Sequence, residues 1–173
     1  MRSTLLFSVL GIAAILLGAA FVLGLDAGPF TIERDTTIAA TPDHVFDHLE
    51  DLHRWETWFP WLQAKNTKRT YLGAAKGVGA GCEWENETQG KNRLTITESR
   101  APELLTTRLD FTHGRSRQFI LKLTLEPQGA QTHARITLTG NDTQASKLFD
   151  RFKTYITKDL DHALKNLAQT AAK

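Results

Sequence analysis

The stretch TQASKLFDRFKTYITKDLDHALKNLAQTA, which runs from Thr143 to Ala171, decides the fold of this chain. Its apolar residues recur every three or four positions, the spacing that places side chains on one face of an α-helix. That face carries Phe149, Phe152, Ile156, Leu160, Ala163 and Leu167, and the opposite face carries Asp150, Lys153, Lys158, Asp161 and Lys165. Asn141-Asp142-Thr143 offers side chains that can cap the first turn. A helix about 40 Å long needs an apolar surface to lie on, so the rest of the chain should supply one.

The residues before this helix alternate between apolar and polar side chains, as half-buried strands do. A strand at 32–40 is followed by a helix that begins at Thr41-Pro42 and by a tryptophan-rich helical piece at 55–62. About six strands then occupy 70–139, and alternation on one face is typical of an antiparallel sheet with one face in water. The order predicts an α+β fold in which a curved antiparallel sheet is covered by the last helix.

Residues 5–25 form an uncharged apolar stretch between Arg2 and Asp26. As a helix it would span about 31 Å, close to the roughly 30 Å of a bilayer core. We expect 1–28 to be a single transmembrane anchor with a short hinge at Ala27-Gly28-Pro29, and 29–173 to be the folded domain. Arg2 keeps the amino terminus in the cytoplasm, so the domain would face the periplasm from the inner membrane. The alternative is a signal peptide cleaved after Ala20, which would release a secreted domain.

Composition excludes several classes of partner. The formal net charge of +2 and the scattered basic residues do not favour nucleic acid. The single cysteine, Cys82, excludes an intramolecular disulfide and a cysteine-rich metal site. His44 and His48 are spaced to chelate a metal from one helix, but no third ligand is evident, so we expect solvent-facing histidines, no metal and no cofactor.

Three stretches of the chain resemble a known family: IAATPDHVF at 38–46, WETWFPW at 55–61 and GVGAGCEW at 77–84. They are similar to the SRPBCC superfamily of START and birch-pollen-allergen proteins, in its bacterial polyketide cyclase/dehydrase and lipid transport branch. The resemblance covers 30–173. It implies a helix-grip fold, in which the curved sheet wraps around the long C-terminal helix and leaves a cavity between them. Such cavities hold apolar ligands.

The resemblance also implies which residues line that cavity. The candidates are Trp58, Trp61, Trp84, Leu94, Ile96, Leu109, Phe111, Phe119, Leu121, Ile136, Phe152 and Ile156. The alternative is that all of them are ordinary core. The cluster Trp55, Trp58, Phe59 and Trp61 has two interpretations as well, because tryptophan is enriched both in cores and at membrane interfaces. It either packs onto the sheet or touches a bilayer beside the cavity.

A few residues suggest chemistry. Arg34 and Glu98 fall on inward faces by strand parity, where they could form a polar acid–base pair, although strand ends also reach water. Cys82 should be a small buried residue rather than a nucleophile. The glycines at 77, 79 and 81 precede a strand rather than a helix, which does not fit a phosphate-binding loop.

The sequence therefore predicts a membrane-tethered carrier that sequesters a hydrophobic or lipid-like small molecule. A polyketide cyclase, dehydratase or hydrolase that uses Arg34 and Glu98 is one alternative, and a ligand-free interaction module at the membrane is another. A carrier should contain a cavity, whereas an interaction module should have a filled core and an exposed patch.

Overall fold

The structure is a computed structural model, and it describes residues 29–87, 90–112, 117–141 and 147–172. The helices among them are α2 (Pro42–Glu50), α3 (Trp55–Trp58), α4 (Pro60–Gln63) and α5 (Lys147–Ala171). No helix in these ranges is long and apolar enough to cross a membrane. The apolar stretch 5–25 lies outside them, so the expected anchor stays a prediction.

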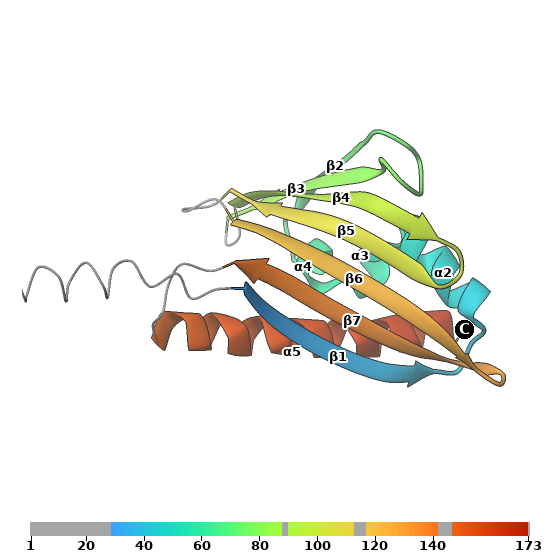
Figure 1. Cartoon of the computed structure of the whole chain (residues 1–173). Helices are drawn as coiled ribbons and strands as arrows, with labels where there is room; N and C mark the ends of the chain where they lie inside the picture. The colour runs from blue at the N-terminus through green and yellow to red at the C-terminus, as the bar shows by residue number, and fades with distance from the viewer. Residues whose placement is uncertain (1–28, 88–89, 113–116, 142–146, 173) are drawn as a thin grey trace, which may run out of the picture.

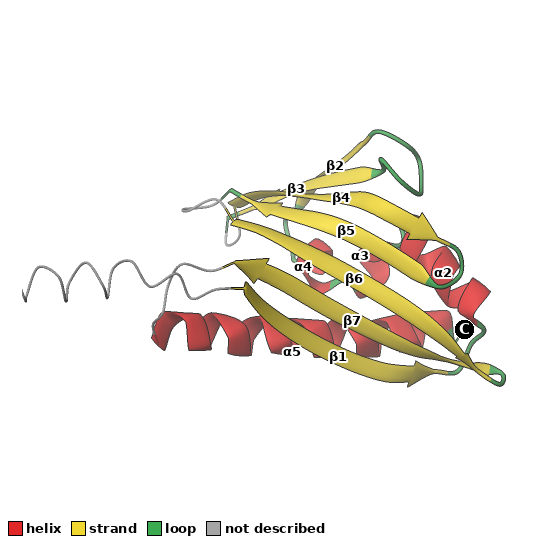
Figure 2. Ribbon diagram, viewed as in Figure 1, coloured by secondary structure: helices red, strands yellow, loops and turns green. Residues whose placement is uncertain are grey.

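Seven strands form one antiparallel sheet. They are β1 (Pro29–Ile38), β2 (Lys68–Leu72), β3 (Gly81–Asn86), β4 (Gly90–Arg100), β5 (Leu104–Phe111), β6 (Arg117–Gln128) and β7 (Gln131–Asn141). Their order across the sheet is β1-β7-β6-β5-β4-β3-β2, so the first strand pairs with the last and β1 and β2 are the two edges. The sheet curves over α5 (Figure 1), and α2, α3 and α4 lie on the same side (Figure 2). This arrangement confirms the helix-grip fold.

The strands bury one face as their alternation predicts. In β6, Phe119, Leu121, Leu123 and Leu125 each expose 3% or less of their surface, while Lys122 between them is exposed. Ile136 and Leu138 of β7 are likewise buried, and the register places them opposite Leu123 and Leu121. The buried face therefore continues from strand to strand and forms the core beneath the sheet.

The C-terminal helix α5 buries the predicted stripe. Ile156, Leu160, Ala163 and Leu167 expose 5% or less, and Leu164 joins them. Lys153, Lys158, Asp161 and Lys165 are exposed, as predicted. The expected beginning of the helix at Thr143 and the side chains of Phe149 and Phe152 lie outside the described residues. The helix contacts β1 and the short helix α3, so both the sheet edge and the tryptophan-rich segment hold it in place.

The loop before β3 needs glycine for steric reasons. Gly73 and Gly79 have φ angles of +73° and +89°, a backbone region that glycine adopts without strain. A Cβ atom on Gly73 would lie 2.2 Å from the Gly79 carbonyl oxygen. The Gly79 N–H donates to the Ile96 carbonyl at 3.0 Å. The loop is thus fastened to β4 and leads into strand β3, as the sequence predicted.

Candidate functional site

The predicted cavity-lining residues form the centre of the core. Those whose surface is at most 5% exposed are Trp58, Trp61, Trp84, Leu94, Ile96, Leu109, Phe119, Leu121, Ile136 and Ile156. Phe111 is only partly buried, and the side chain of Phe152 lies outside the described residues. An open cavity would leave part of its lining uncovered, whereas neighbouring side chains cover these residues almost completely. No open space therefore lies between these described side chains. Whether a cavity lies beside the start of α5, where the side chain of Phe152 is not described, stays a prediction.

The tryptophan cluster fills space between the sheet and the helices. Trp55, Trp58, Phe59 and Trp61 expose 0–3% of their surface, so the hypothesis that they touch a bilayer is wrong. The indole N–H groups of Trp55 and Trp58 are satisfied locally. Trp55 donates to the Leu49 carbonyl at 2.7 Å, and Trp58 donates to the His48 carbonyl at 3.2 Å. The short helices α3 and α4 depend on the burial of these rings, because a four-residue helix has little stability of its own.

Five aromatic rings meet at the end of the sheet where β1 begins and β5 ends. We call this cluster, formed by Phe30, Trp61, Trp84, Phe111 and Phe119, the ring end. The Phe111 ring is the centre: its centroid lies 5.3 Å from Trp61, 6.0 Å from Trp84 and 5.5 Å from Phe119. Phe30 reaches Phe119 at 5.9 Å. All four contacts are edge-to-face, the arrangement that aromatic rings prefer.

The ring end connects the core to the surface. Phe30 and Phe111 are only partly buried, whereas the other three rings are closed off. From Trp61 the ring contacts continue inward through Phe59 at 5.0 Å, which in turn contacts Trp55 at 4.9 Å. A row of aromatic rings therefore runs from the molecular surface to the interior between the sheet and α5.

A carboxylate on α5 holds one ring of this row. The Trp61 indole N–H donates to Asp159 Oδ2 at 2.7 Å, across 98 positions of sequence. Burial raises the pKa of the half-buried Asp159 carboxyl above its ordinary value, although the Trp61 hydrogen bond and the nearby His162 oppose that shift. Sequence reasoning missed Asp159, because its spacing on the helix does not distinguish it from the solvent-facing charges.

Arg34 and Glu98 do not form a pair. Arg34 faces α5 as parity predicts, and its Nε lies 3.0 Å from Asp161 Oδ1. The inward prediction for Glu98 is wrong, because a bulge between Ile96 and Glu98 reverses the parity of β4. Glu98 stands opposite Thr106 on the outer face, accepts a hydrogen bond from the Thr106 hydroxyl at 3.2 Å and pairs with Arg100 at 3.1 Å. The two residues therefore lie on opposite faces and share no chemistry.

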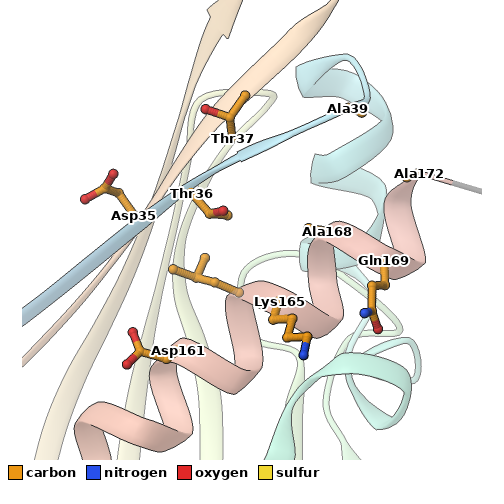
Figure 3. Close-up of a pocket in the computed structure, with 10 residues that line it drawn as sticks. Asp35, Thr36, Thr37, Ala39, Asp161, Lys165, Ala168, Gln169 and Ala172 are labelled. Carbon is orange, nitrogen blue, oxygen red and sulfur yellow. The ribbon is translucent and has the colours of Figure 1, made fainter.

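A groove runs between the second half of β1 and the second half of α5 (Figure 3). Its volume is about 460 Å³, within the range of small-molecule pockets. Three alanines, Ala39, Ala168 and Ala172, line it, and their short side chains leave room that longer ones would fill. We call it the alanine groove. Its rim is polar, and its other lining residues are Asp35, Thr36, Thr37, Asp161, Leu164, Lys165 and Gln169.

The histidine pair and the cysteine have no catalytic surroundings. His44 is exposed as expected, but His48 is partly buried, and burial lowers its pKa, with Arg54 and His44 adding to the shift. Among the described residues no three metal-binding side chains come together. Cys82 is fully buried, and burial raises the pKa of its thiol to about 11, so the thiolate nucleophile is disfavoured.

A second polar cluster that the sequence did not indicate joins α3 to β2. The Tyr71 hydroxyl donates to Glu56, and Arg69 Nη1 lies 3.6 Å from Glu56 Oε2. The His53 ring stacks on Tyr71 with centroids 3.8 Å apart. Burial raises the pKa of Tyr71, which keeps its hydroxyl protonated. The cluster fastens the tryptophan-rich segment to the edge of the sheet.

Similar solved structures share the fold at low sequence identity. Protein CV1439 from Chromobacterium violaceum is 18% identical, with a TM-score of 0.62, covering 83% of this chain and 98% of its own. The protein Ara h 8.0201 is 13% identical, with a TM-score of 0.63, and also covers 83% of this chain and 98% of its own. Norcoclaurine synthase from Thalictrum flavum is 11% identical, with a TM-score of 0.65, covering 84% and 87%. At such identities the likeness concerns the fold alone.

The sequence itself matches one family. No curated protein matches the chain. The family model described as polyketide cyclase / dehydrase and lipid transport matches residues 29–172, which include every described helix and strand. Together with the helix-grip fold, this match shows that the chain belongs to the polyketide cyclase / dehydrase and lipid transport family.

Proposed function

We propose that this chain is a membrane-tethered carrier for a hydrophobic, lipid-like small molecule, held between the sheet and α5. The observation that carries the proposal is the row of aromatic rings that leads from the partly exposed Phe30 and Phe111 to the buried Trp61 and Trp55. Family membership supports it, because lipid transport is one of the activities for which the family is named. The row gives an apolar molecule a continuous path of ring surface into the interior.

Because the described interior is filled, the ligand must displace side chains as it binds. Burying about 300 Å² of apolar surface contributes roughly 7 kcal/mol before the costs of binding. Moving Trp61 out of its place breaks one hydrogen bond to Asp159, which costs about 1 kcal/mol. Opening of this kind selects a minor state of the protein, and the ligand's preference for that state sets the binding affinity.

The membrane tether is the second part of the proposal. Its support is the length and lack of charge of residues 5–25, which suit a single bilayer-spanning helix. With Arg2 in the cytoplasm, the domain would project into the periplasm. An anchored carrier samples lipid at the membrane surface and does not need to search for the bilayer by diffusion.

Native mass spectrometry of the full chain, purified from membranes in a mild detergent, tests the carrier. We expect a fraction of the protein to retain a small apolar molecule, and we expect Trp61→Ala, which frees interior volume, to raise that fraction. Tyr155→Ala, at an exposed position on α5, is the matched control and should change nothing. Bare protein from several lipid extracts, for both wild type and Trp61→Ala, would contradict the carrier.

The filled interior also favours a second candidate, a ligand-free interaction module. In that case the alanine groove would be the working surface, because it has open space without any rearrangement of side chains. The structure does not support an enzyme that uses Arg34 and Glu98 as its acid–base pair, because the two residues lie on opposite faces of the sheet. Bare protein in the mass spectrometer, combined with loss of a cellular partner in Ala168→Phe, would favour the module.

A further inference from the structure

The two ends of the sheet differ in chemistry. At one end β1 begins at Pro29, β5 ends at Phe111 and β6 begins at Arg117, and the register aligns these points across the sheet. The ring end occupies this end. At the opposite end, which we call the far end, lie the β4–β5 turn and the second half of β6, with the charged residues Arg100, Glu103 and Glu126. Charged residues lie beside the rings as well, because Arg117 stands opposite Phe111 and Lys91 stands opposite Glu85. The two ends therefore differ in their aromatic rings and not in their charge.

The length of chain between the apolar stretch and the sheet is short. The apolar stretch ends at Leu25, and only Asp26, Ala27 and Gly28 precede Pro29. Four residue steps span at most about 14 Å, even fully extended. If residues 5–25 cross a bilayer, the end of the sheet at which β1 begins must lie within that distance of the bilayer surface.

Phe30 is the second residue of β1, and the other rings follow across the sheet. Adjacent strands lie about 4.8 Å apart, so β5 and its Phe111 lie about 14 Å sideways from β1. Phe30 and Phe111 therefore lie at the end of the sheet nearest the bilayer, and the far end points into the aqueous phase. Partly exposed aromatic rings are the side chains that membrane–water interfaces favour.

We propose that the ring end faces the membrane that anchors the chain, and that the ligand passes directly between Phe30 and Phe111 from the adjacent leaflet. The partner is a lipid bilayer, and the ligand class is an amphiphile already dissolved in it, taken from the same membrane. This inference rests on the proposed function for the ligand and adds the orientation of the domain and the source of its cargo.

Site-directed fluorescence on the full chain in liposomes tests the orientation. Cys82 is fully buried, so a cysteine introduced at Thr112, beside the ring end, or at Gln128, at the far end, takes a fluorescent label selectively. Phosphatidylcholine brominated on its acyl chains quenches labels near the bilayer. We expect quenching at Thr112→Cys to exceed that at Gln128→Cys several-fold. Equal quenching, or stronger quenching at Gln128→Cys, would overturn the proposal.

Lengthening the tether sharpens the same test. A flexible Gly-Ser insertion between Gly28 and Pro29 frees the domain from the surface. We expect it to reduce the quenching at Thr112→Cys while the label's spectrum in detergent stays unchanged. The decisive variant combines the long insertion with Phe30→Ser and Phe111→Ser. If the label at Thr112→Cys is still quenched in this variant, the two rings do not hold the domain at the membrane, and the proposal is overturned.

Transfer of a fluorescent lipid from donor to acceptor liposomes separates this inference from the carrier itself. We expect Phe30→Ser and Phe111→Ser to slow transfer, and Tyr155→Ser, at a position 63% exposed on α5, to leave it unchanged. If the detergent-solubilised protein retains its ligand but the ring variants transfer lipid as fast as wild type, the proposed entry between Phe30 and Phe111 is wrong and the carrier proposal is unaffected. If the protein retains no ligand at all, the carrier proposal itself is wrong.

Discussion

The junction between helices and sheet is filled by aromatic rings at the ring end and left open at the alanine groove. At the ring end, large rings from β1, α4, β3, β5 and β6 meet edge to face around Phe111 and Phe119. At the alanine groove, α5 faces β1 with Ala168 and Ala172, and a volume of about 460 Å³ stays open. The two regions therefore differ in the size of the side chains at the junction.

The region with more open volume, the alanine groove, has less apolar surface to offer a ligand than the ring end. The apolar surface of the open groove is small, because it comes mainly from three alanines while Leu164 is only 3% exposed. Its rim carries Asp35, Asp161 and Lys165. The filled ring end would expose several aromatic rings once it opened. Since apolar binding energy scales with the apolar area removed from water, a lipid gains more at the ring end than in the groove. For the proposed carrier, we therefore expect the lipid at the ring end, although the groove has more open volume.

The largest effect should follow from emptying the ring end. Phe119 is 2% exposed and contacts both Phe30 and Phe111, so Phe119→Ala removes a ring that its neighbours cannot replace. We expect a loss of about 3–5 kcal/mol in the free energy of unfolding. Tyr155→Ala on the exposed face of α5 should cost less than about 0.5 kcal/mol. Urea unfolding followed by circular dichroism measures both, and similar losses would show that the ring end is not tightly packed.

The next largest difference in stability should come from enlarging two alanines of α5. Ala163 is fully buried, and Ala168 lines the groove. We expect Ala163→Phe to destabilise the protein by about 1–3 kcal/mol or more through overpacking. Ala168→Phe should fit into the open volume with a cost below about 0.5 kcal/mol. Thermal unfolding of the two variants checks this, and comparable losses would mean that the groove is no roomier than the core.

Trp61→Phe removes the hydrogen bond between Trp61 and Asp159 but keeps an aromatic ring at this position. Phenylalanine keeps the edge contact with Phe111 but leaves the half-buried Asp159 without its indole donor. We expect a loss of about 1–2 kcal/mol. Trp61→Phe combined with Asp159→Leu should recover part of it, because the unsatisfied carboxyl is then gone. A double variant no more stable than Trp61→Phe alone would assign the loss to packing.

The smallest effect concerns pH. Burial raises the pKa of Asp159, so between the ordinary and raised values the folded protein binds a proton that the unfolded chain has released. Stability should therefore fall as pH rises through this range. Asp159→Asn accepts the Trp61 hydrogen bond without titrating, so it should flatten that fall and be at least as stable as wild type at neutral pH. Unfolding midpoints against pH measure the slope, and an unchanged slope would contradict the assignment.

Asp161→Asn on the same helix is the matched control for that pH series. It removes the 3.0 Å ion pair with Arg34, which is largely exposed. We expect a small loss at neutral pH, below about 1 kcal/mol, because exposed ion pairs contribute little. A change opposite in sign to that of Asp159→Asn distinguishes the half-buried carboxyl from the exposed one.

Periodicity predicted what depends on local spacing. The buried stripe of α5 and the inward residues of β6 follow from repeats of 3.6 and two residues, and both are confirmed. Glu98 was misplaced because a bulge inserts one residue, which alternation cannot reveal. Asp159 was missed because its partner, Trp61, is 98 positions away. Whether the tryptophans line a cavity or fill it depends on how closely side chains pack, and a sequence pattern carries no information on that distance.

Photo-crosslinking shows which of the two regions holds the ligand, when the full chain in liposomes is exposed to a lipid that carries a diazirine on its acyl chain. We expect labelled peptides from the ring end, around Phe30, Trp61, Phe111 and Phe119. We also expect labelling to fall in Phe111→Ser and to stay unchanged in Ala168→Phe. Labels confined to 35–39 and 161–172, lost in Ala168→Phe and kept in Phe111→Ser, would contradict it.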